Sequence, residues 1–463
     1  MLYSSTRGQD TNLLFEEAVM MGLADDGGLL VPDDFPYVKN KFDEWRALSF
    51  SELSLEIMLL FTSGRIPREE LMPLVRRSYV NFRHPEITPV KVVGQIYILE
   101  LFHGPTFAFK DVALQILGNL FEFFLSKRNH PLRILGATSG DTGSAAIHGM
   151  RGKKGVEIFM LYPKGRVSRI QELQMTTVLD SNIHNLATEG SFDDAQAIVK
   201  ALFNDQEFKH NFHLGSINSI NWARIMVQIV YYFYAWLQVT KNDSDVVSFA
   251  VPTGNFGNVL AGYYAKCMGL PIDKLIVGTN ENDILHRFFS KGEYKITDVK
   301  ETLSPSMDIQ ISSNFERYLF DLAGKSSEQL RLWMAEFEQS GRVKFKREFL
   351  KKTQKDFLSA CVSDEEILDT VRKFHRDKGY LLDPHTAVGI RAAEKTYPQT
   401  PVICLACAHP AKFGEAVQQA LGTEPELPDE LSVLSKLKTR CKTVSANPGA
   451  IKEVLLETIK LKS

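Results

Sequence analysis

The side chain with the clearest chemical potential in this sequence is that of Lys110, because it stands at the head of an apolar helical stripe. Counting from Lys110 at helical spacing gives Leu114, Leu117, Phe121 and Phe124, so the lysine begins the buried face of a predicted helix. Burial beside a helix N-terminus disfavours the ammonium form, and an uncharged amine is what Schiff-base chemistry requires. Lys110 is therefore a candidate nucleophile, and an ordinary solvated lysine is the alternative.

Two glycine-containing loops, at residues 136–143 and 252–258, each follow an apolar run and precede a helical one. Glycine lets the backbone turn its N–H groups toward an anion, and the following helix N-terminus adds a favourable dipole. Neither loop has the G-x-G-x-x-G pattern or the Gly-Lys-Ser/Thr of a P-loop, so nicotinamide and nucleoside-triphosphate sites lack their usual signature. Each loop is a candidate anion site, and a tight turn between a strand and a helix is the alternative.

Three arginines are candidates for binding a phosphorylated substrate. Arg166 and Arg169 lie in a basic loop, and Arg224 opens a largely apolar helical run. Because the net charge of the chain is only −2, an anionic substrate must be bound by local cations and N–H groups. The alternatives are a solvated loop for the first two arginines and a structural ion pair for Arg224.

Cys404 and Cys407 form a single C-x-x-C motif at the end of an apolar run. One such pair, with only His409 nearby, is weak evidence for a metal, and we predict no metal site. Strand ends carry the sites of open α/β sheets, so Cys407 and His409 are expected near one. Asp383 and Pro384 together predict a helix N-cap followed by proline at the first helical position.

The composition is that of a globular protein, with 463 residues, 44% hydrophobic and 24% charged. The nearly balanced charge gives no reason to expect a nucleic acid or an anionic membrane as partner. We expect no signal peptide, because the first residues lack a basic and an apolar region, and no apolar run approaches about 18 residues. Five cysteines, an odd number, fit a reducing compartment. We therefore expect a cytoplasmic protein with a small-molecule substrate.

The order of predicted elements indicates the fold class. Residues from about 12 to 90 are mostly helical, and strand, loop and helix alternate from about residue 91. The apolar β-type runs are 95–99, 132–135, 156–161, 246–251, 275–277 and 402–405. This alternation predicts an α/β protein with largely parallel sheets. The charged segment from about 290 to 365 is expected to form helices or insertions, and the last thirty residues a peripheral segment.

Taken in order along the chain, these motifs resemble those of the threonine synthase family of fold-type II pyridoxal-phosphate (PLP) enzymes, closest to its animal threonine synthase-like 2 branch. The matching segments are 3–7, 15–18, 22–29, 101–111, 137–143, 252–258 and 408–413. The resemblance implies two open parallel-sheet α/β domains behind a mostly helical N-terminal region. We expect a helical region at 1–95, a smaller α/β domain at 96–225 with the lysine and the first loop, and a larger one at 226–463 with the second loop.

The resemblance also implies roles for individual residues. Lys110 would bind the cofactor covalently and serve as the proton-transfer base. The PLP phosphate would be bound by Gly254, Asn255, Phe256, Gly257 and Asn258. The substrate carboxylate would be bound by Thr138, Ser139, Gly140 and Thr142, with Asp141 near O3′ of the cofactor. Cys407 stands where the family has a threonine facing the pyridine nitrogen, and a thiol is a weaker donor than a hydroxyl.

The activity implied is phosphate elimination from O-phosphothreonine or O-phosphohomoserine, giving 2-oxobutyrate, ammonia and phosphate. We favour this phospho-lyase outcome because of the likeness to the animal branch and because of Cys407. One alternative is the synthesis of threonine from O-phosphohomoserine, which needs the same base, electron sink and phosphate site. Another is a binding or signalling protein on an inactive scaffold. An oligomeric assembly is compatible with all three.

Overall fold

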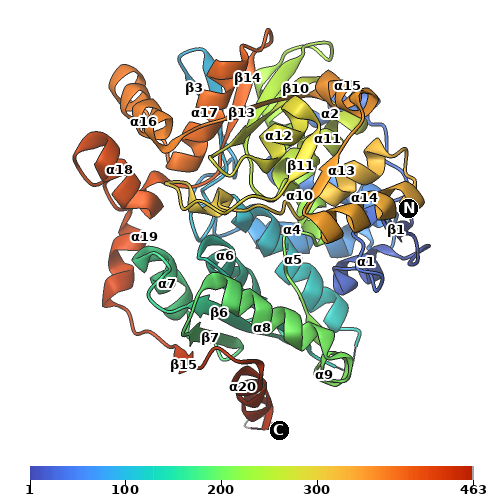
Figure 1. The fold of residues 1–463 in the computed structure, drawn as a ribbon, viewed down its shortest axis with the longest axis vertical. Helices are drawn as coiled ribbons and strands as arrows, with labels where there is room; N and C mark the ends of the chain where they lie inside the picture. The colour runs from blue at the N-terminus through green and yellow to red at the C-terminus, as the bar shows by residue number, and fades with distance from the viewer. Residues whose placement is uncertain (129, 461–463) are drawn as a thin grey trace. The chain divides into compact units, whose positions relative to one another are not determined.

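The computed structural model describes residues 1–128 and 130–460 and divides into two compact units (Figure 1). Unit 1 comprises Met1–Phe109 and Ser219–Glu426, and unit 2 comprises Lys110–Asn218 and Leu427–Ser463. The expected N-terminal helical region belongs to unit 1, because α3 (Phe50–Thr62) packs against α10 (Trp222–Val239). None of the helices in the described ranges is long and apolar enough to cross a membrane.

Unit 1 is built on a six-stranded sheet in the order β13-β10-β9-β14-β4-β3. Its strands are β13 (Phe357–Cys361), β10 (Ile272–Thr279), β9 (Val247–Pro252), β14 (Val402–Ala406), β4 (Ile96–Glu100) and β3 (Val90–Val93). All neighbours are parallel except β3 and β4, which form an antiparallel pair. Four of the six predicted apolar runs are confirmed as strands here, whereas β13 lies in the charged segment where none was expected.

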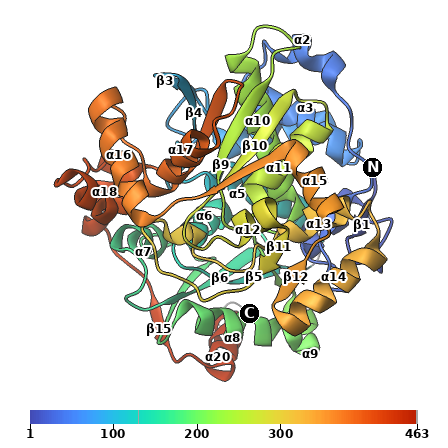
Figure 2. The same ribbon diagram turned by 45° about the horizontal axis from the view of Figure 1, so that its top comes forward.

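Helices cover both faces of this sheet (Figure 2). Alternate residues of a strand point to opposite faces. A Cβ at Gly278 of β10 would lie 3.1 Å from the carbonyl oxygen of Val388 in α17 (Pro384–Thr396), whereas Leu275 of the same strand contacts the Gly262 position of α11 (Gly257–Cys267). The helix α10 corresponds to the predicted apolar helical run that Arg224 opens; it packs on α11 and is buried along almost its whole length.

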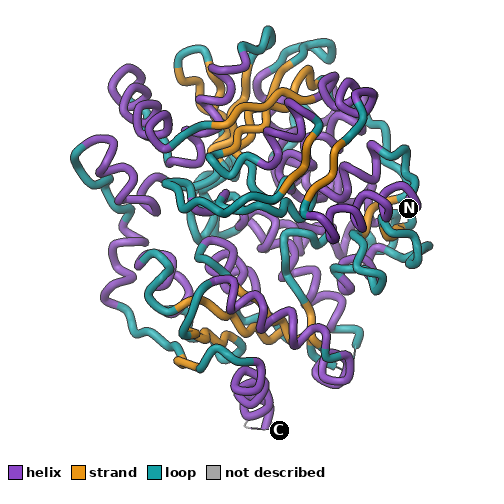
Figure 3. Tube along the Cα trace, in the orientation of Figure 1, coloured by secondary structure: helices purple, strands orange, loops and turns teal. Residues whose placement is uncertain are grey.

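The remaining elements of unit 1 surround this core (Figure 3). Its other helices are α1 (Phe15–Met21), α2 (Phe42–Trp45), α4 (Arg68–Tyr79), α12 (Ile284–Lys291), α13 (Phe315–Leu322), α14 (Ser327–Ser340), α15 (Arg347–Asp356), α16 (Asp364–Lys378) and α18 (Gly414–Leu421), with short 3-10 turns η1 (Lys39–Lys41), η2 (Pro305–Met307) and η3 (Pro410–Phe413). Two antiparallel pairs, β1 (Tyr3–Ser5) with β2 (Leu30–Pro32) and β11 (Glu293–Lys295) with β12 (Arg342–Lys344), complete it.

Unit 2 has a parallel five-stranded sheet in the order β15-β7-β6-β5-β8. Its strands are β15 (Lys442–Val444), β7 (Ile183–Thr188), β6 (Val156–Pro163), β5 (Leu132–Ala137) and β8 (Leu214–Gly215). Its helices are α5 (Lys110–Leu125), α6 (Asp141–Met150), α7 (Arg169–Thr176), α8 (Phe192–Asn204), α9 (Gln206–Phe212), α19 (Asp429–Ser432) and α20 (Pro448–Lys460), with the turn η4 (Val433–Lys436).

The C-terminal segment is part of the core of unit 2. The strand β15 pairs with β7, and α20 packs against α8. Ile451 and Leu455 of α20 are fully buried in the same apolar cluster as Leu186 of β7. The expectation of a peripheral segment is therefore wrong for residues 442–460, whose short apolar stretch was not recognised as a strand and a packed helix.

Candidate active site

The segment that leads into Lys110 is hydrogen-bonded to the segment that follows β14. The N–H of Phe109 donates to the carbonyl oxygen of Cys407 at 2.8 Å, and the N–H of His409 donates to that of Phe107 at 3.1 Å. Phe107 adopts a left-handed conformation, with φ 59°, which makes the tight turn before this pairing. Two motifs that lie 300 residues apart in the sequence are thus adjacent in unit 1, and Lys110 is the next residue of the chain.

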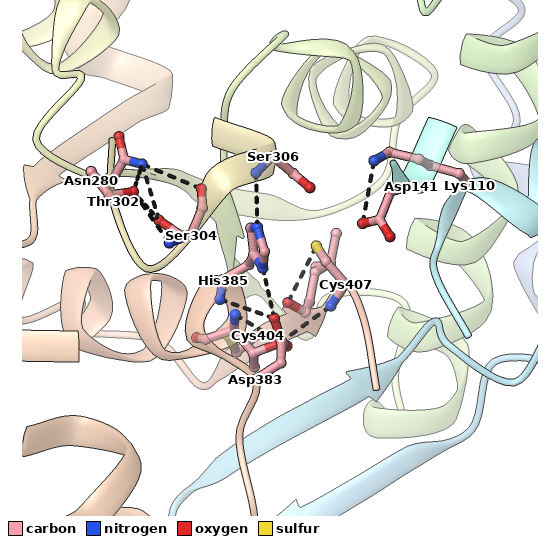
Figure 4. Close-up of polar contacts among 12 residues, drawn as sticks. Lys110, Asp141, Asn280, Thr302, Ser304, Ser306, Asp383, His385, Cys404 and Cys407 are labelled. Carbon is pink, nitrogen blue, oxygen red and sulfur yellow. Dashed lines mark hydrogen bonds and ion pairs between the residues drawn. The ribbon is translucent and has the colours of Figure 1, made fainter. Parts of the chain in front are cut away.

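Lys110 is the first residue of α5, and the apolar stripe predicted behind it is buried. Its Nζ lies 3.5 Å from Oδ2 of Asp141, with side chains only 11% and 6% exposed (Figure 4). Nε2 of Gln171 donates to the other carboxylate oxygen at 2.8 Å, and Oγ of Ser168 donates to Oε1 of Gln171 at 3.0 Å. Asp141 is therefore placed to stabilise the charged amine, and Gln171, which the sequence did not indicate, positions Asp141.

The loop 138–142 begins α6 and is shaped by Thr138. The Thr138 hydroxyl accepts hydrogen bonds from the N–H groups of Gly140 at 3.0 Å and Gly143 at 2.8 Å. Gly140 has φ 144°, and a Cβ there would lie 2.2 Å from Oε1 of Gln171. Ser139 is exposed and Thr142 is partly exposed. The first N–H groups of α6 and the hydroxyls of Ser139 and Thr142 can therefore bind a carboxylate, whereas the hydroxyl of Thr138 is engaged within the loop.

The loop 254–258 connects β9 to α11 and fits a phosphate group. The first N–H groups of α11 have no intrahelical acceptor. Nδ2 of Asn258, a residue only 7% exposed, has no hydrogen-bond partner among the described residues. Its Oδ1 is fixed by the hydroxyl groups of Tyr231 and Tyr232, so Nδ2 must point elsewhere. An unpartnered buried donor beside a helix N-terminus suits an anion such as the phosphate of PLP.

The segment 312–314 holds the carbonyl groups of this loop. Oγ of Ser312 donates to the carbonyl oxygen of Gly254 at 2.6 Å, and the N–H of Asn314 donates to that of Asn255 at 3.1 Å. Phe256 has φ 62°. A Cβ at Gly257 would lie 3.2 Å from Nδ2 of Asn314, so a larger side chain at 257 would press on this segment. These contacts engage the carbonyl groups of Gly254 and Asn255 with the segment 312–314.

The three candidate arginines differ in their surroundings. Arg166 and Arg169 are exposed and lie on one loop at the start of α7, where Ser168 is the N-cap. Arg224 lies in α10 of unit 1 and is only 2% exposed. Burial lowers the pKa of its guanidinium to about 10. The structure thus brings Arg166 and Arg169 together and places Arg224 in a different unit.

Cys407 follows β14 directly, and its side chain is 7% exposed. Its N–H donates to Oγ1 of Thr386 at 3.3 Å. Burial raises the pKa of the neighbouring thiol of Cys404, and burial lowers the pKa of His409 to about 4, so both groups are neutral at neutral pH. All five cysteines are free thiols, and the described residues include no cluster of three or more His, Cys, Asp or Glu that could hold a metal ion.

Comparisons with known proteins show which family the chain resembles. The family "Threonine synthase N terminus" matches residues 2–79, "Pyridoxal-phosphate dependent enzyme" matches 83–343, and "Threonine synthase, C-terminal" matches 386–455. A threonine synthase of Schizosaccharomyces pombe is 51% identical over 91% of this chain and 89% of that protein. A crystal structure of PLP-bound threonine synthase from Brucella melitensis has a TM-score of 0.96 and 44% identity, covering 98% of this chain and 99% of that one. This likeness confirms the expected fold.

The animal branch is a more distant relative than the sequence motifs suggested. The threonine synthase-like 2 protein of Homo sapiens is 40% identical over 95% of this chain and 93% of that protein. The threonine synthase of Schizosaccharomyces pombe is more similar, at 51% identity. The likeness to the threonine synthase family is confirmed, whereas the expected closest similarity to its animal branch is not borne out by these identities.

Proposed function

Because the chain belongs to the threonine synthase family, we propose that it converts O-phosphohomoserine and water into threonine and phosphate. It is a PLP-dependent carbon–oxygen lyase that acts on phosphate esters. The observation that carries the synthase outcome is the 51% identity to a protein named threonine synthase, against 40% to a threonine synthase-like 2 protein. The phospho-lyase outcome becomes the second candidate.

When bound, PLP supplies an electron sink for the charge left on Cα after proton removal. Lys110 binds the cofactor and, once its amine is released, accepts the Cα proton at Nζ. Asp141, 3.5 Å from Nζ, stabilises the protonated amine until the proton is returned. The phosphate of the cofactor is bound by the loop 254–258, where Asn258 offers its Nδ2.

The substrate is held through its two anionic ends. Its carboxylate is bound at the N-terminus of α6 by the loop 138–142. Its phosphate is bound by cations among Arg166, Arg169 and Arg224. Arg166 and Arg169 are the stronger candidates, because they share one exposed loop, whereas Arg224 is deeply buried.

The product mixture distinguishes the two outcomes. The purified enzyme is supplied with O-phosphohomoserine and, separately, with O-phosphothreonine, while phosphate, 2-oxobutyrate and threonine are assayed. We expect threonine and phosphate in equal amounts from O-phosphohomoserine. Phosphate accompanied by 2-oxobutyrate in place of threonine would establish the phospho-lyase instead.

Alanine at the arginine that binds the substrate phosphate is expected to lower kcat/KM for O-phosphohomoserine about ten- to a hundredfold. A charge-assisted contact to a dianion is lost, while the cofactor absorbance is unchanged. Single variants of Arg166, Arg169 and Arg224 are compared with Lys164→Ala, which removes a neighbouring exposed charge. Wild-type kcat/KM in all three arginine variants would assign the substrate phosphate to other residues.

The second candidate function is favoured by Cys407, which stands where a hydroxyl is expected to face the pyridine nitrogen. Cys407→Thr is expected to shift the absorbance of the bound cofactor and to raise the ratio of threonine to 2-oxobutyrate, because a hydroxyl is a stronger hydrogen-bond donor than a thiol. Cys404→Thr is the matched control, since Cys404 is also buried but lies earlier in β14. Identical spectra and product ratios in wild type and Cys407→Thr would show that Cys407 only packs at the strand end.

A further inference from the structure

Asp383 does more than cap a helix. Its side chain is fully buried and accepts the N–H groups of His385 at 2.9 Å and Thr386 at 3.3 Å, as the N-cap of α17. It also accepts two side-chain hydrogen bonds. One comes from Nδ1 of His385 at 2.9 Å (Figure 4), and the other comes from the hydroxyl of Thr386. An N-cap needs only the backbone contacts, so the two side-chain contacts call for a separate explanation.

The first side-chain contact leads toward the loop 254–258. Because the carboxylate of Asp383 accepts from Nδ1 of His385, the proton of the ring lies on Nδ1 and Nε2 is an acceptor. The N–H of Ser306 donates to this Nε2 at 3.2 Å. A Cβ at Gly254 would lie only 3.1 Å from the carbonyl oxygen of Ser306. The turn η2 that His385 fixes is therefore in close contact with the loop proposed to bind the cofactor phosphate.

The second contact leads to the residue proposed to face the pyridine ring. The hydroxyl of Thr386 donates its hydrogen to Asp383, so its oxygen is oriented to accept from another group. The group that donates to it is the N–H of Cys407, at 3.3 Å. The carbonyl oxygen of Cys407 in turn accepts from Phe109 at 2.8 Å. Asp383 thereby acts on the backbone that precedes Lys110 as well as on Cys407.

We propose that Asp383 is a positioning residue for the cofactor, acting on its phosphate through His385 and Ser306 and on its ring through Thr386 and Cys407. This proposal rests on the proposed function, which assigns the phosphate to the loop 254–258 and the ring to Cys407. The carboxylate matters because its two oxygens accept from all four donors at once. An amide at this position would present N–H₂ to one of them and leave two donors facing each other.

The turn η2 is also held by hydrogen bonds that do not involve His385. Loss of the His385 contact should therefore loosen the turn without unfolding it. Nδ2 of Asn280 donates to Oγ of Ser304 at 3.0 Å and to Oδ1 of Asp308 at 2.7 Å. Thr302 also donates to Oδ1 of Asp308, at 2.7 Å. Variants of His385 are therefore suitable probes of cofactor position in a folded protein.

The test compares PLP with pyridoxal, which lacks the phosphate. Each full-length enzyme is stripped of cofactor, and the Kd for each compound is measured by absorbance, together with the melting temperature. His385→Phe is expected to weaken PLP binding roughly three- to tenfold and to leave pyridoxal binding unchanged. Thr386→Val is expected to weaken both compounds by similar factors and to shift the absorbance of the bound cofactor. Asp383→Asn is expected to show both effects.

Two controls separate positioning from stability. Ser363 caps the neighbouring helix α16 without reaching the loop or Cys407, so Ser363→Ala should lower the melting temperature and change neither Kd. His385→Gln, whose amide oxygen can accept from Ser306, should restore PLP binding relative to His385→Phe. Equal weakening of PLP and pyridoxal by His385→Phe, or wild-type Kd values in all three variants, would overturn the proposal.

Asn258→Asp distinguishes failure of this proposal from failure of the proposed function. In this variant a carboxylate oxygen replaces the unpartnered Nδ2 of Asn258 and would repel the cofactor phosphate. PLP binding should therefore fall more than tenfold, while pyridoxal binding is retained. If Asn258→Asp has this effect and the Asp383, His385 and Thr386 variants bind PLP as the wild type does, only the positioning role fails. If Asn258→Asp binds PLP normally, the assignment of the cofactor phosphate to the loop 254–258 is wrong. The proposed role of Asp383 is then wrong as well.

Discussion

Replacing Lys110 by alanine is expected to abolish the absorbance of the lysine-bound cofactor and to lower kcat about 10⁴-fold. In the proposed function one side chain supplies both the covalent link to PLP and the base at Cα, so its loss removes both roles at once. The fold should survive, because Lys110 is the first residue of α5 and the buried stripe behind it is unchanged. Absorbance spectra, phosphate release and circular dichroism measure the three effects.

The control for Lys110→Ala is Lys127→Ala, which removes an exposed lysine just after the other end of the same helix. It should retain the cofactor colour and the wild-type kcat. Phosphate release at the wild-type rate by Lys110→Ala would disprove the assignment of the base. Failure of the wild-type protein itself to take up PLP would instead favour a binding or signalling role on an inactive scaffold.

The strands that sequence reasoning identified are those whose runs are mainly apolar, with no two consecutive polar residues. The run at 156–161 corresponds to β6, and the run at 402–405 to β14. Strands buried on both faces of a parallel sheet consist of such runs, so tertiary structure adds little to the pattern. For the same reason, the apolar stripe behind Lys110 was sufficient to predict that the lysine begins a buried helix face.

The strand β7 was missed because His184 and Asn185 interrupt its apolar pattern. In the structure the ring of His184 stacks on Phe159, with centroids 4.5 Å apart, and Nδ2 of Asn185 donates to the carbonyl oxygen of Met175 at 2.9 Å. Phe159 belongs to β6 and Met175 belongs to α7. Each polar side chain thus gains a contact with a residue of another element, and such a partner is not visible in a local sequence window.

The residues of the candidate site also differ in whether a local sequence pattern predicts them. Lys110 and the two glycine loops are local patterns, because strand, turn and helix follow one another within a few residues. The N-cap role of Asp383 is local too and is confirmed. The contact of His385 with Ser306 joins residues that are 79 positions apart, and the pair Asp141–Gln171 spans 30. Such side-chain pairs depend on how the elements pack, so the sequence indicated the residues proposed to react but not those proposed to position them.

The second large effect is expected at Gly118, where α5 and α6 approach each other most closely. A Cβ at Gly118 would lie 2.0 Å from the carbonyl oxygen of Gly149, and a Cβ at Gly149 would lie 2.6 Å from that of Leu114. Neither contact can be relieved by turning a side chain, because both involve backbone atoms. The crossing matters for chemistry as well, since α5 begins with Lys110 and α6 begins with Asp141.

Gly118→Ala is therefore expected to lower the free energy of unfolding by about 2–3 kcal/mol. Helix propensity alone predicts the opposite sign, a gain of up to about 1 kcal/mol for alanine in a helix interior, so the sign of the change decides which effect dominates. Gly449→Ala in α20 is the control, because its Cβ would approach only the side chain of Asn447, at 3.3 Å. Urea denaturation gives the free energies, and PLP titration should show weaker binding in Gly118→Ala, because moving α5 against α6 separates Lys110 from Asp141. A Gly118→Ala protein as stable as the wild type would mean that the helices separate at little cost, and the close crossing would then not be what holds the lysine in place.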